Sequence, residues 1–180
     1  MLPRTDAPAP HMPDATALRI RPARAGDADA LWRILAPTIR AGETYALPAG
    51  MSREAALAYW TGPDRETFGA EAPRTPGEAL GTYYLRASQL GGGAHVANCG
   101  YMTGAWAAGG GVARAMCEHS LAHVRSRGFR ARQFNFVVST NEHAVRLWQR
   151  LGFDVVGRLP HAFPRPRGEY VDALVLFRAL

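Results

Sequence analysis

Three consecutive glycines, Gly109, Gly110 and Gly111, separate a strand-like run at residues 95–103 from a helix-like run. Behind them, apolar residues recur at helical spacing: Ala113, Met116, Cys117, Leu121 and Val124. Gly128 is placed to end this helix in a left-handed conformation. Glycines at a helix start let backbone N–H groups approach an anion, which the helix dipole also favours. The junction therefore predicts a strand, an anion-binding loop and a helix, with a merely flexible loop as the alternative.

The composition limits the classes of protein to consider. The chain has 180 residues, enough for one domain, which we expect at 17–180 behind a proline-rich tail at 1–16. A net charge of +6 suits an acidic ligand or nucleic acid. We expect no nucleic-acid partner, because no helix-turn-helix and no interleaving of aromatic and basic residues is evident. No GxxxxGK[ST] motif follows the glycines, which argues against a nucleotide triphosphatase.

Membrane, disulfide and metal roles find little support. No apolar run approaches the roughly 20 residues that span a bilayer. Two cysteines, Cys99 and Cys117, form neither a disulfide framework nor a zinc ligand set, so a cytoplasmic location is expected. His119 and His123 lie four residues apart on the predicted main helix, without a third ligand. We interpret them as a solvated helix face and expect no metal.

Alternating and apolar runs predict the strands, and caps predict the helices. The expected strands are 18–21, 67–70, 80–88, 95–103, 132–138, 153–157 and 170–177. Besides the main helix, we expect one from Gly26 or Asp27 to about Leu35, one at 53–60 capped by Ser52, and one opened by a capping box at Ser139 and Glu142. Residues 37–50 and 159–168 are expected to be irregular.

The order of these elements predicts a mixed sheet. Runs 80–88 and 95–103 around a glycine turn form an antiparallel hairpin. The main helix then makes a right-handed crossover, so 95–103 and 132–138 should be parallel neighbours. Gly100 inside a strand favours a bulge that would free backbone N–H groups, or else it simply permits close packing.

The segments GGGVARAM and VVSTNEHAVRLWQRLGF resemble the GNAT superfamily of N-acetyltransferases, and the resemblance runs from Leu18 to Leu180. It implies an α+β fold, an α/β/α sandwich whose fourth and fifth strands are parallel and splayed. It also implies acetyl-CoA as co-substrate, with its pyrophosphate at the glycine loop. Ala108 stands where the family usually has Arg or Gln. The implied cofactor contacts are Met102, Thr103, Gly109, Gly110, Gly111, Val112, Ala113, Asn141 and Trp148.

A closer similarity is to the yeast proline-analogue (azetidine-2-carboxylate) acetyltransferases and their bacterial relatives, through GETY, AHVANCGYM, FNFVVSTN and GRLPHAF. In that group two asparagines hold the substrate, and they match Asn98 and Asn135. Thr44 and Tyr45 fall in the loop that resembles the substrate loop. Asparagine is disfavoured within strands, so the pair suggests a polar pocket. The alternative is two satisfied amides that fix the strand pairing.

The resemblance implies direct attack of a neutral amine on the thioester. Asn135, Glu43 and Tyr101 are the candidate catalytic residues, with Glu43 as base unless it is a solvated carboxylate or a water chain serves instead. Many family members place an acidic tyrosine where this chain has Trp148, whose indole N–H cannot serve as an acid. Tyr101 and Cys99 are the remaining candidates for that acid, although each could be purely structural.

The expected function is therefore acetyl transfer to the amine of a small amino acid or proline-like analogue. Another amine, such as an aminoglycoside, polyamine or protein N-terminus, is one alternative, and a non-catalytic CoA-binding module is another. The expected partner is a small molecule, with a homodimer left open.

Overall fold

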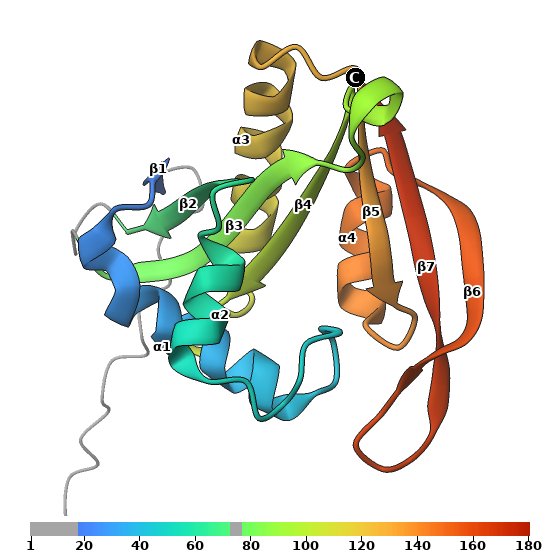
Figure 1. Cartoon of the computed structure of the whole chain (residues 1–180), viewed down its shortest axis with the longest axis horizontal. Coiled ribbons are helices and arrows are strands. Elements are labelled where there is room, and N and C mark those ends of the chain that lie inside the picture. Colours follow the sequence, from blue (N-terminus) through green and yellow to red (C-terminus); the bar gives the residue numbers. More distant parts are fainter. Residues whose placement is uncertain (1–17, 73–76) are drawn as a thin grey trace, which may run out of the picture.

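A computed structural model describes residues 18–72 and 77–180, and within them seven strands form one sheet in the order β1-β2-β3-β4-β5-β7-β6 (Figure 1). The predicted tail at 1–16 lies outside the described residues. The elements are β1 Arg19–Pro22, α1 Ala28–Ala41, α2 Arg53–Trp60, β2 Glu66–Glu71, β3 Ala79–Ala87, β4 Val96–Thr103, α3 Val112–Ser126, β5 Ala131–Val138, α4 Glu142–Arg150, β6 Asp154–Pro164 and β7 Tyr170–Ala179. Short 3-10 turns occur at Ala25–Asp27, Gly91–Gly93 and Ala105–Ala107.

The strand pairing confirms the predicted mixed sheet. β3 and β4 form the antiparallel hairpin, and β4 and β5 are parallel, while the other neighbouring pairs are antiparallel. The parallel pairing covers only Val96–Asn98 against Ala131–Gln133, after which the two strands separate. Since α3 follows β4 and α4 follows β5, both helices begin at the same edge of the sheet, beside this opening.

The prediction of a bulge near Gly100 is wrong. β4 pairs with β3 without a register shift from Ala97 to Thr103. The irregularity lies instead in β5, whose register against β7 shifts between Phe134 and Val137. The strands therefore part because β5 bends along β7.

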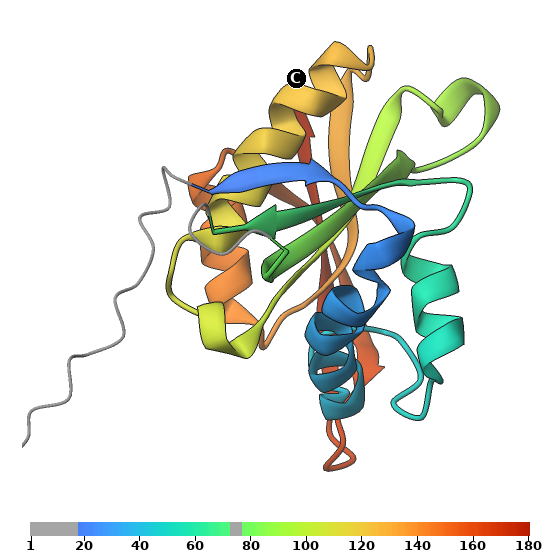
Figure 2. The same ribbon diagram turned by 90° about the vertical axis from the view of Figure 1, so that its left-hand side faces the viewer.

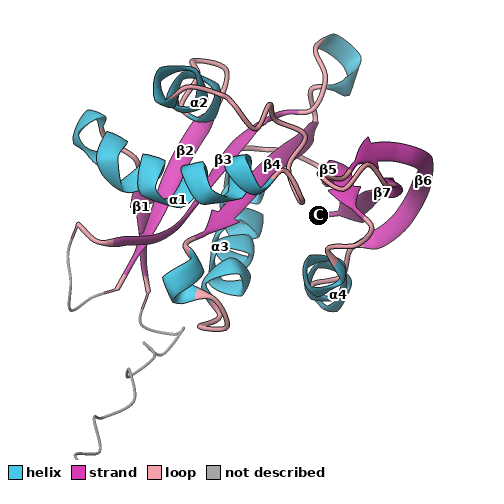
Figure 3. Cartoon of the chain, turned by 90° about the horizontal axis from the view of Figure 1, so that it is seen from below, coloured by secondary structure: helices cyan, strands magenta, loops and turns pink. Residues whose placement is uncertain are grey.

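Helices cover both faces of the sheet, as predicted (Figures 2 and 3). α1 and α2 pack on one face over a core that includes Ile34, Trp60 and Tyr84. α3 and α4 pack on the other face over a larger core that includes Met116 and Phe134. No helix in the described residues is long and apolar enough to cross a membrane.

Helix α1 continues through Pro37, where we predicted an irregular segment. Pro37 is exposed, and so is Arg33, whose carbonyl loses its usual partner and can bind water instead. Ile39 extends the buried face beyond the proline. Gly42, with φ of 60°, ends the helix in a left-handed conformation. Burial of the apolar face thus outweighs one lost backbone hydrogen bond.

Two predicted boundaries in the C-terminal third also change. Asn141, not Ser139, caps α4, because its side chain accepts the Ala144 N–H at 3.4 Å. Strand β6 runs on to Pro164 through most of the segment that we expected to be a loop. Its pairing with β7 resumes after an irregularity between Leu159 and Phe163 that contains His161 at φ 51°.

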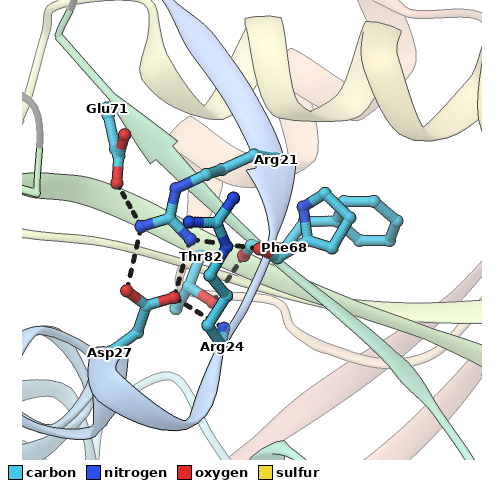
Figure 4. Close-up of polar contacts among 7 residues, drawn as sticks. Arg21, Arg24, Asp27, Phe68, Glu71 and Thr82 are labelled. Atoms are coloured by element: carbon cyan, nitrogen blue, oxygen red, sulfur yellow. Dashed lines mark hydrogen bonds and ion pairs between the residues drawn. The ribbon is translucent and has the colours of Figure 1, made fainter.

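A partly buried ion cluster connects β1 to the rest of the sheet (Figure 4). The Arg21 guanidinium pairs with Asp27 at 2.7 and 2.9 Å and also with the buried carboxylate of Glu71. Asp27 accepts the Arg24 N–H at 2.7 Å as well. The hydrogen bonds from Arg21 hold the pKa of Asp27 below its usual value. One arginine therefore links β1, β2 and the start of α1.

We expect Asp27→Asn to lower the unfolding free energy at pH 7 by about 1–2 kcal/mol, since a charged hydrogen-bond acceptor is lost. A depressed pKa contributes stability above the unfolded value of about 4, and that stability is lost as pH falls through the folded value. The difference between wild type and variant should therefore shrink in acid. Urea unfolding between pH 7 and pH 3 measures it. Asp29→Asn is the control, because Asp29 is 88% exposed and should cost less than about 0.5 kcal/mol.

Candidate active site

A cleft of about 280 Å³ lies where β4 and β5 separate, between the α1–α2 loop and helix α4. It gathers residues from six parts of the chain: that loop, α2, β3, β4, β5 and α4 with its N-cap. Among its lining residues are seven of the predicted site residues: Thr44, Tyr45, Asn98, Tyr101, Asn135, Asn141 and Trp148.

The two strand asparagines have their amides oriented by the sheet. Asn98 donates from Nδ2 to the Gln133 carbonyl at 3.1 Å, across the last pair before β4 and β5 part. Asn135 accepts at Oδ1 from Ser88 Oγ at 3.2 Å and from Gln133 Nε2 at 2.9 Å. Asn98 thus does fix strand pairing, as the alternative reading supposed. Its Oδ1 acceptor and the Nδ2 donors of Asn135 are left for a ligand.

Gly100 allows two tyrosines to approach the floor of the cleft. A Cβ on Gly100 would lie 2.5 Å from a ring carbon of Tyr84 and 2.8 Å from the Tyr45 hydroxyl. The Tyr45 hydroxyl donates to the Tyr101 carbonyl at 3.1 Å, so the α1–α2 loop is anchored on β4. Burial raises the pKa of Tyr45 well above its usual value, which keeps this phenol protonated. Gly100 therefore serves close packing, the second of the two roles that we considered.

The candidate acids on β4 point into the core. The Tyr101 hydroxyl is buried and bonds Ser120 Oγ on α3 at 2.6 Å, and burial raises its pKa well above the usual value. Burial likewise raises the pKa of the Cys99 thiol. Trp148 stacks on Phe134 with ring centroids 4.7 Å apart and is buried. It is thus a core residue that also forms one wall of the cleft.

Other predicted site residues lie outside the cleft lining. Glu43 is exposed on the α1–α2 loop. Met102 is buried in the core beneath α1 and α2, so only its backbone could reach a ligand from β4. Thr103, half-buried, is the last residue of β4.

The glycine loop has an open backbone at the N-terminus of α3. Gly109 and Gly111 adopt φ of 78° and 73°, and Gly111 is the N-cap. A Cβ on Gly109 would meet nothing within 4 Å. Gly110 donates to the Ala107 carbonyl at 3.2 Å, and the first helical bond of α3 runs from the Ala115 N–H to the Gly111 carbonyl at 3.0 Å. The amides at 112–114 therefore have no intrahelical acceptor. The loop can therefore present N–H groups to an anion, at the edge of the sheet where the cleft opens.

The paired histidines face the sheet, so our interpretation as a solvated helix face is wrong. His119 Nδ1 lies 2.8 Å from the Tyr83 hydroxyl, and His123 Nε2 lies 2.9 Å from Glu66. Burial lowers the pKa of His119. Both rings pack edge-on against Phe68 of β2, which explains why they lie on the inner side of α3. Within residues 18–72 and 77–180, no group of metal-ligating side chains is found.

Sequence reasoning missed three cleft residues that have polar side chains, Tyr59, Tyr84 and Arg86. The two tyrosine hydroxyls lie 3.4 Å apart, and the Arg65 guanidinium lies over both rings, at 4.6 and 4.7 Å from their centroids. The alternation of β3 could have indicated Tyr84 and Arg86, because residues two apart share one face of a strand.

Comparison with known proteins gives a consistent picture. The model of the family described as "Acetyltransferase (GNAT) family" matches residues 30–153. The N-acetyltransferase aca1 of Schizosaccharomyces pombe is 32% identical over 98 residues, which make up 53% of this chain and 46% of that protein. The match thus spans less than half the length of this curated relative.

Solved structures agree over more of the chain. A GCN5-related N-acetyltransferase from Kribbella flavida is 40% identical with a TM-score of 0.85, covering 92% of this chain and 99% of that one. A phosphinothricin acetyltransferase from Sinorhizobium meliloti, solved in complex with AcCoA, is 20% identical with a TM-score of 0.80, covering 91% and 89%. The second likeness concerns the fold alone.

Proposed function

Because the chain belongs to the GNAT family of acetyltransferases, we propose that it moves an acetyl group from acetyl-CoA to the amine of a small amino acid or proline-like analogue. The enzyme class and the co-substrate follow from the family. The amine is the proposed part. It rests chiefly on one observation, the oriented pair of asparagine amides in the cleft.

The asparagine pair supports an amino acid through its polarity. The Asn98 Oδ1 is an acceptor, which suits the N–H of an amine, and the Asn135 Nδ2 is a donor, which suits a carboxylate oxygen. The backbone of Asn98 is fixed by pairing with both β3 and β5. Asn135 lies in the irregular stretch of β5, but its amide is held by Ser88 and Gln133. Both amides are therefore oriented before a ligand binds. Holding the amine in place lowers the entropic cost of the attack.

The loop at 109–113 is suited to bind the diphosphate of acetyl-CoA, because its backbone N–H groups are open and it lies at the N-terminus of α3. Bound there, acetyl-CoA supplies the activated acyl group. We also propose that Asn141 and Trp148, which line the cleft, contact the pantetheine arm of acetyl-CoA.

No carboxylate lines the cleft in the described residues, so we propose that the amine loses its proton to water. Glu43 is too exposed to be the preferred base.

The proline-analogue group is the narrower part of the proposal. It is supported by the segments quoted above and by the place of Asn98, Asn135 and Tyr45 in one cleft. The exposed apolar side chains Val155, Val156 and Leu159 on edge strand β6 are compatible with a homodimer.

The first test is whether the natural thioester stabilises the fold. At 100 times its Kd, acetyl-CoA should add about 2.7 kcal/mol, or roughly 5–10 °C in Tm. A thiol-release assay with azetidine-2-carboxylate, proline, spermidine and an aminoglycoside then identifies the amine. A thermal shift with turnover only on the polyamine or aminoglycoside would contradict the amino-acid proposal. A shift without turnover on any amine would favour a non-catalytic CoA-binding module.

A further inference from the structure

Arg86 is the one charged residue that lines the cleft in the part of the chain that the structure describes. It lies on β3 directly opposite Asn98 of β4 in the register of the hairpin. Asn135 of β5 lines the same cleft. Three neighbouring strands therefore contribute a guanidinium and two amides to one polar surface, although the basic composition gave no reason to single out this arginine.

The charge of Arg86 is only partly compensated. Within residues 18–72 and 77–180, its only acidic partner is Asp64, whose Oδ2 lies 3.3 Å from Nη1. The same carboxylate is held more closely by Arg65, from Nε at 2.9 Å and from Nη2 at 3.2 Å. One carboxylate shared between two guanidinium groups leaves a net charge of +1 beside the cleft.

Arg86 also has unused donors. Its Nε is buried without an acceptor, and the side chain as a whole is 34% exposed. A guanidinium presents five N–H donors in a fork that matches a carboxylate. Because Nε itself is not accessible from the cleft, an anion that binds here would pair with the exposed part of the guanidinium and gain both charge neutralisation and hydrogen bonds. A cationic amine such as a polyamine would instead be repelled.

We propose that Arg86 determines specificity by binding the carboxylate of the amine substrate, so that the enzyme selects amines that carry a carboxylate close to the nitrogen. The inference rests on the proposed function and adds a residue to it. Arg86 and the Asn135 donors grip the carboxylate, while the Asn98 acceptor orients the amine. Asp64, which is itself held by Arg65, positions Arg86 through its carboxylate.

The test compares azetidine-2-carboxylate with its carboxamide, which keeps the ring amine and removes the charge. Rates are expressed per neutral amine, because the amide also changes the amine pKa. Wild type should prefer the carboxylate by about tenfold or more, as expected for a hydrogen bond to a charged group. In Arg86→Gln, KM for the carboxylate should rise about tenfold with kcat nearly unchanged. KM for the carboxamide should stay constant, and Arg86→Lys should recover part of the preference.

Arg127→Gln is the matched control, since Arg127 lies at the C-terminal end of α3, at the opposite end of the helix from the glycine loop, and its 58% exposed side chain pairs with Glu66. Each variant must keep the thermal shift with acetyl-CoA, which reports the fold and the carrier site separately. If wild type acetylates both azetidines and Arg86→Gln lowers both equally or neither, the role of Arg86 is overturned and the proposed function stands. If wild type acetylates spermidine in preference to either azetidine, both proposals fail.

Discussion

Asn135→Ala should lower kcat/KM for the amine about 100-fold and leave the affinity for acetyl-CoA unchanged. The Oδ1 of Asn135 is already occupied by Ser88 and Gln133, so the side chain can offer a ligand only its Nδ2 donors. A lost hydrogen bond to a charged group costs about 1.5–3 kcal/mol, and the misplaced amine adds to the barrier. Steady-state kinetics with azetidine-2-carboxylate, together with the acetyl-CoA thermal shift, measure the two effects separately.

Ser88→Ala separates positioning from contact. It removes one of the two bonds that orient the Asn135 amide and leaves the donors in place. We expect a fall of a few-fold in kcat/KM, well short of the alanine variant, because Gln133 still holds the amide. An Asn135→Ala enzyme with normal turnover would remove this residue from the substrate site. It would leave Asn135 the structural role that we considered as an alternative.

The fold was largely readable from the sequence, because its signals are local. Ser52 caps α2, and its Oγ accepts the Ala55 N–H at 3.2 Å, as its position predicted. Gly128 adopts φ of 81° after α3, again as predicted. Each depends on residues within one helical turn, where propensity and capping are decisive.

Two of the predictions that were wrong involve packing or pairing with other parts of the fold. Pro37 argued for a helix end, but the buried face of α1 extends past it to Ile39. The segment after Leu159 looked like a loop because of its prolines and arginines, yet β7 supplies a partner strand as far as Pro164. Tertiary contacts outweighed local composition in both cases, through helix packing at Pro37 and through strand pairing after Leu159.

The residues of the candidate site likewise divide into those that were predicted from the sequence and those that were missed. Asn98, Asn135 and Tyr45 were found through the resemblance and lie together in the cleft. Arg86 was missed because the alternation of β3 indicates only that it shares a face with Tyr84, and not which other segments meet that face. Its role in the cleft is indicated by two tertiary features, its register opposite Asn98 and the sharing of Asp64 with Arg65.

Gly110→Asp should weaken acetyl-CoA binding about 100-fold, whereas Gly110→Asn should bind almost as wild type. The two side chains have nearly the same shape, so any distortion of the turn that Gly110 makes with Ala107 is common to both. They differ by one negative charge at the N-terminus of α3. A carboxylate about 6 Å from a phosphate charge opposes it by about 2.8 kcal/mol at an effective dielectric constant of 20.

The affinities of the two variants for acetyl-CoA are measured by calorimetric titration at low and at high salt. The defect of the Asp variant should shrink as salt rises, because ions screen the repulsion, while the Asn variant changes little. Gly109 and Gly111 are poorer targets, since their positive φ would add backbone strain to any side chain. Equal affinities for the two Gly110 variants would mean that the diphosphate lies elsewhere. The cleft between β4 and β5 would then need another entrance for its thioester.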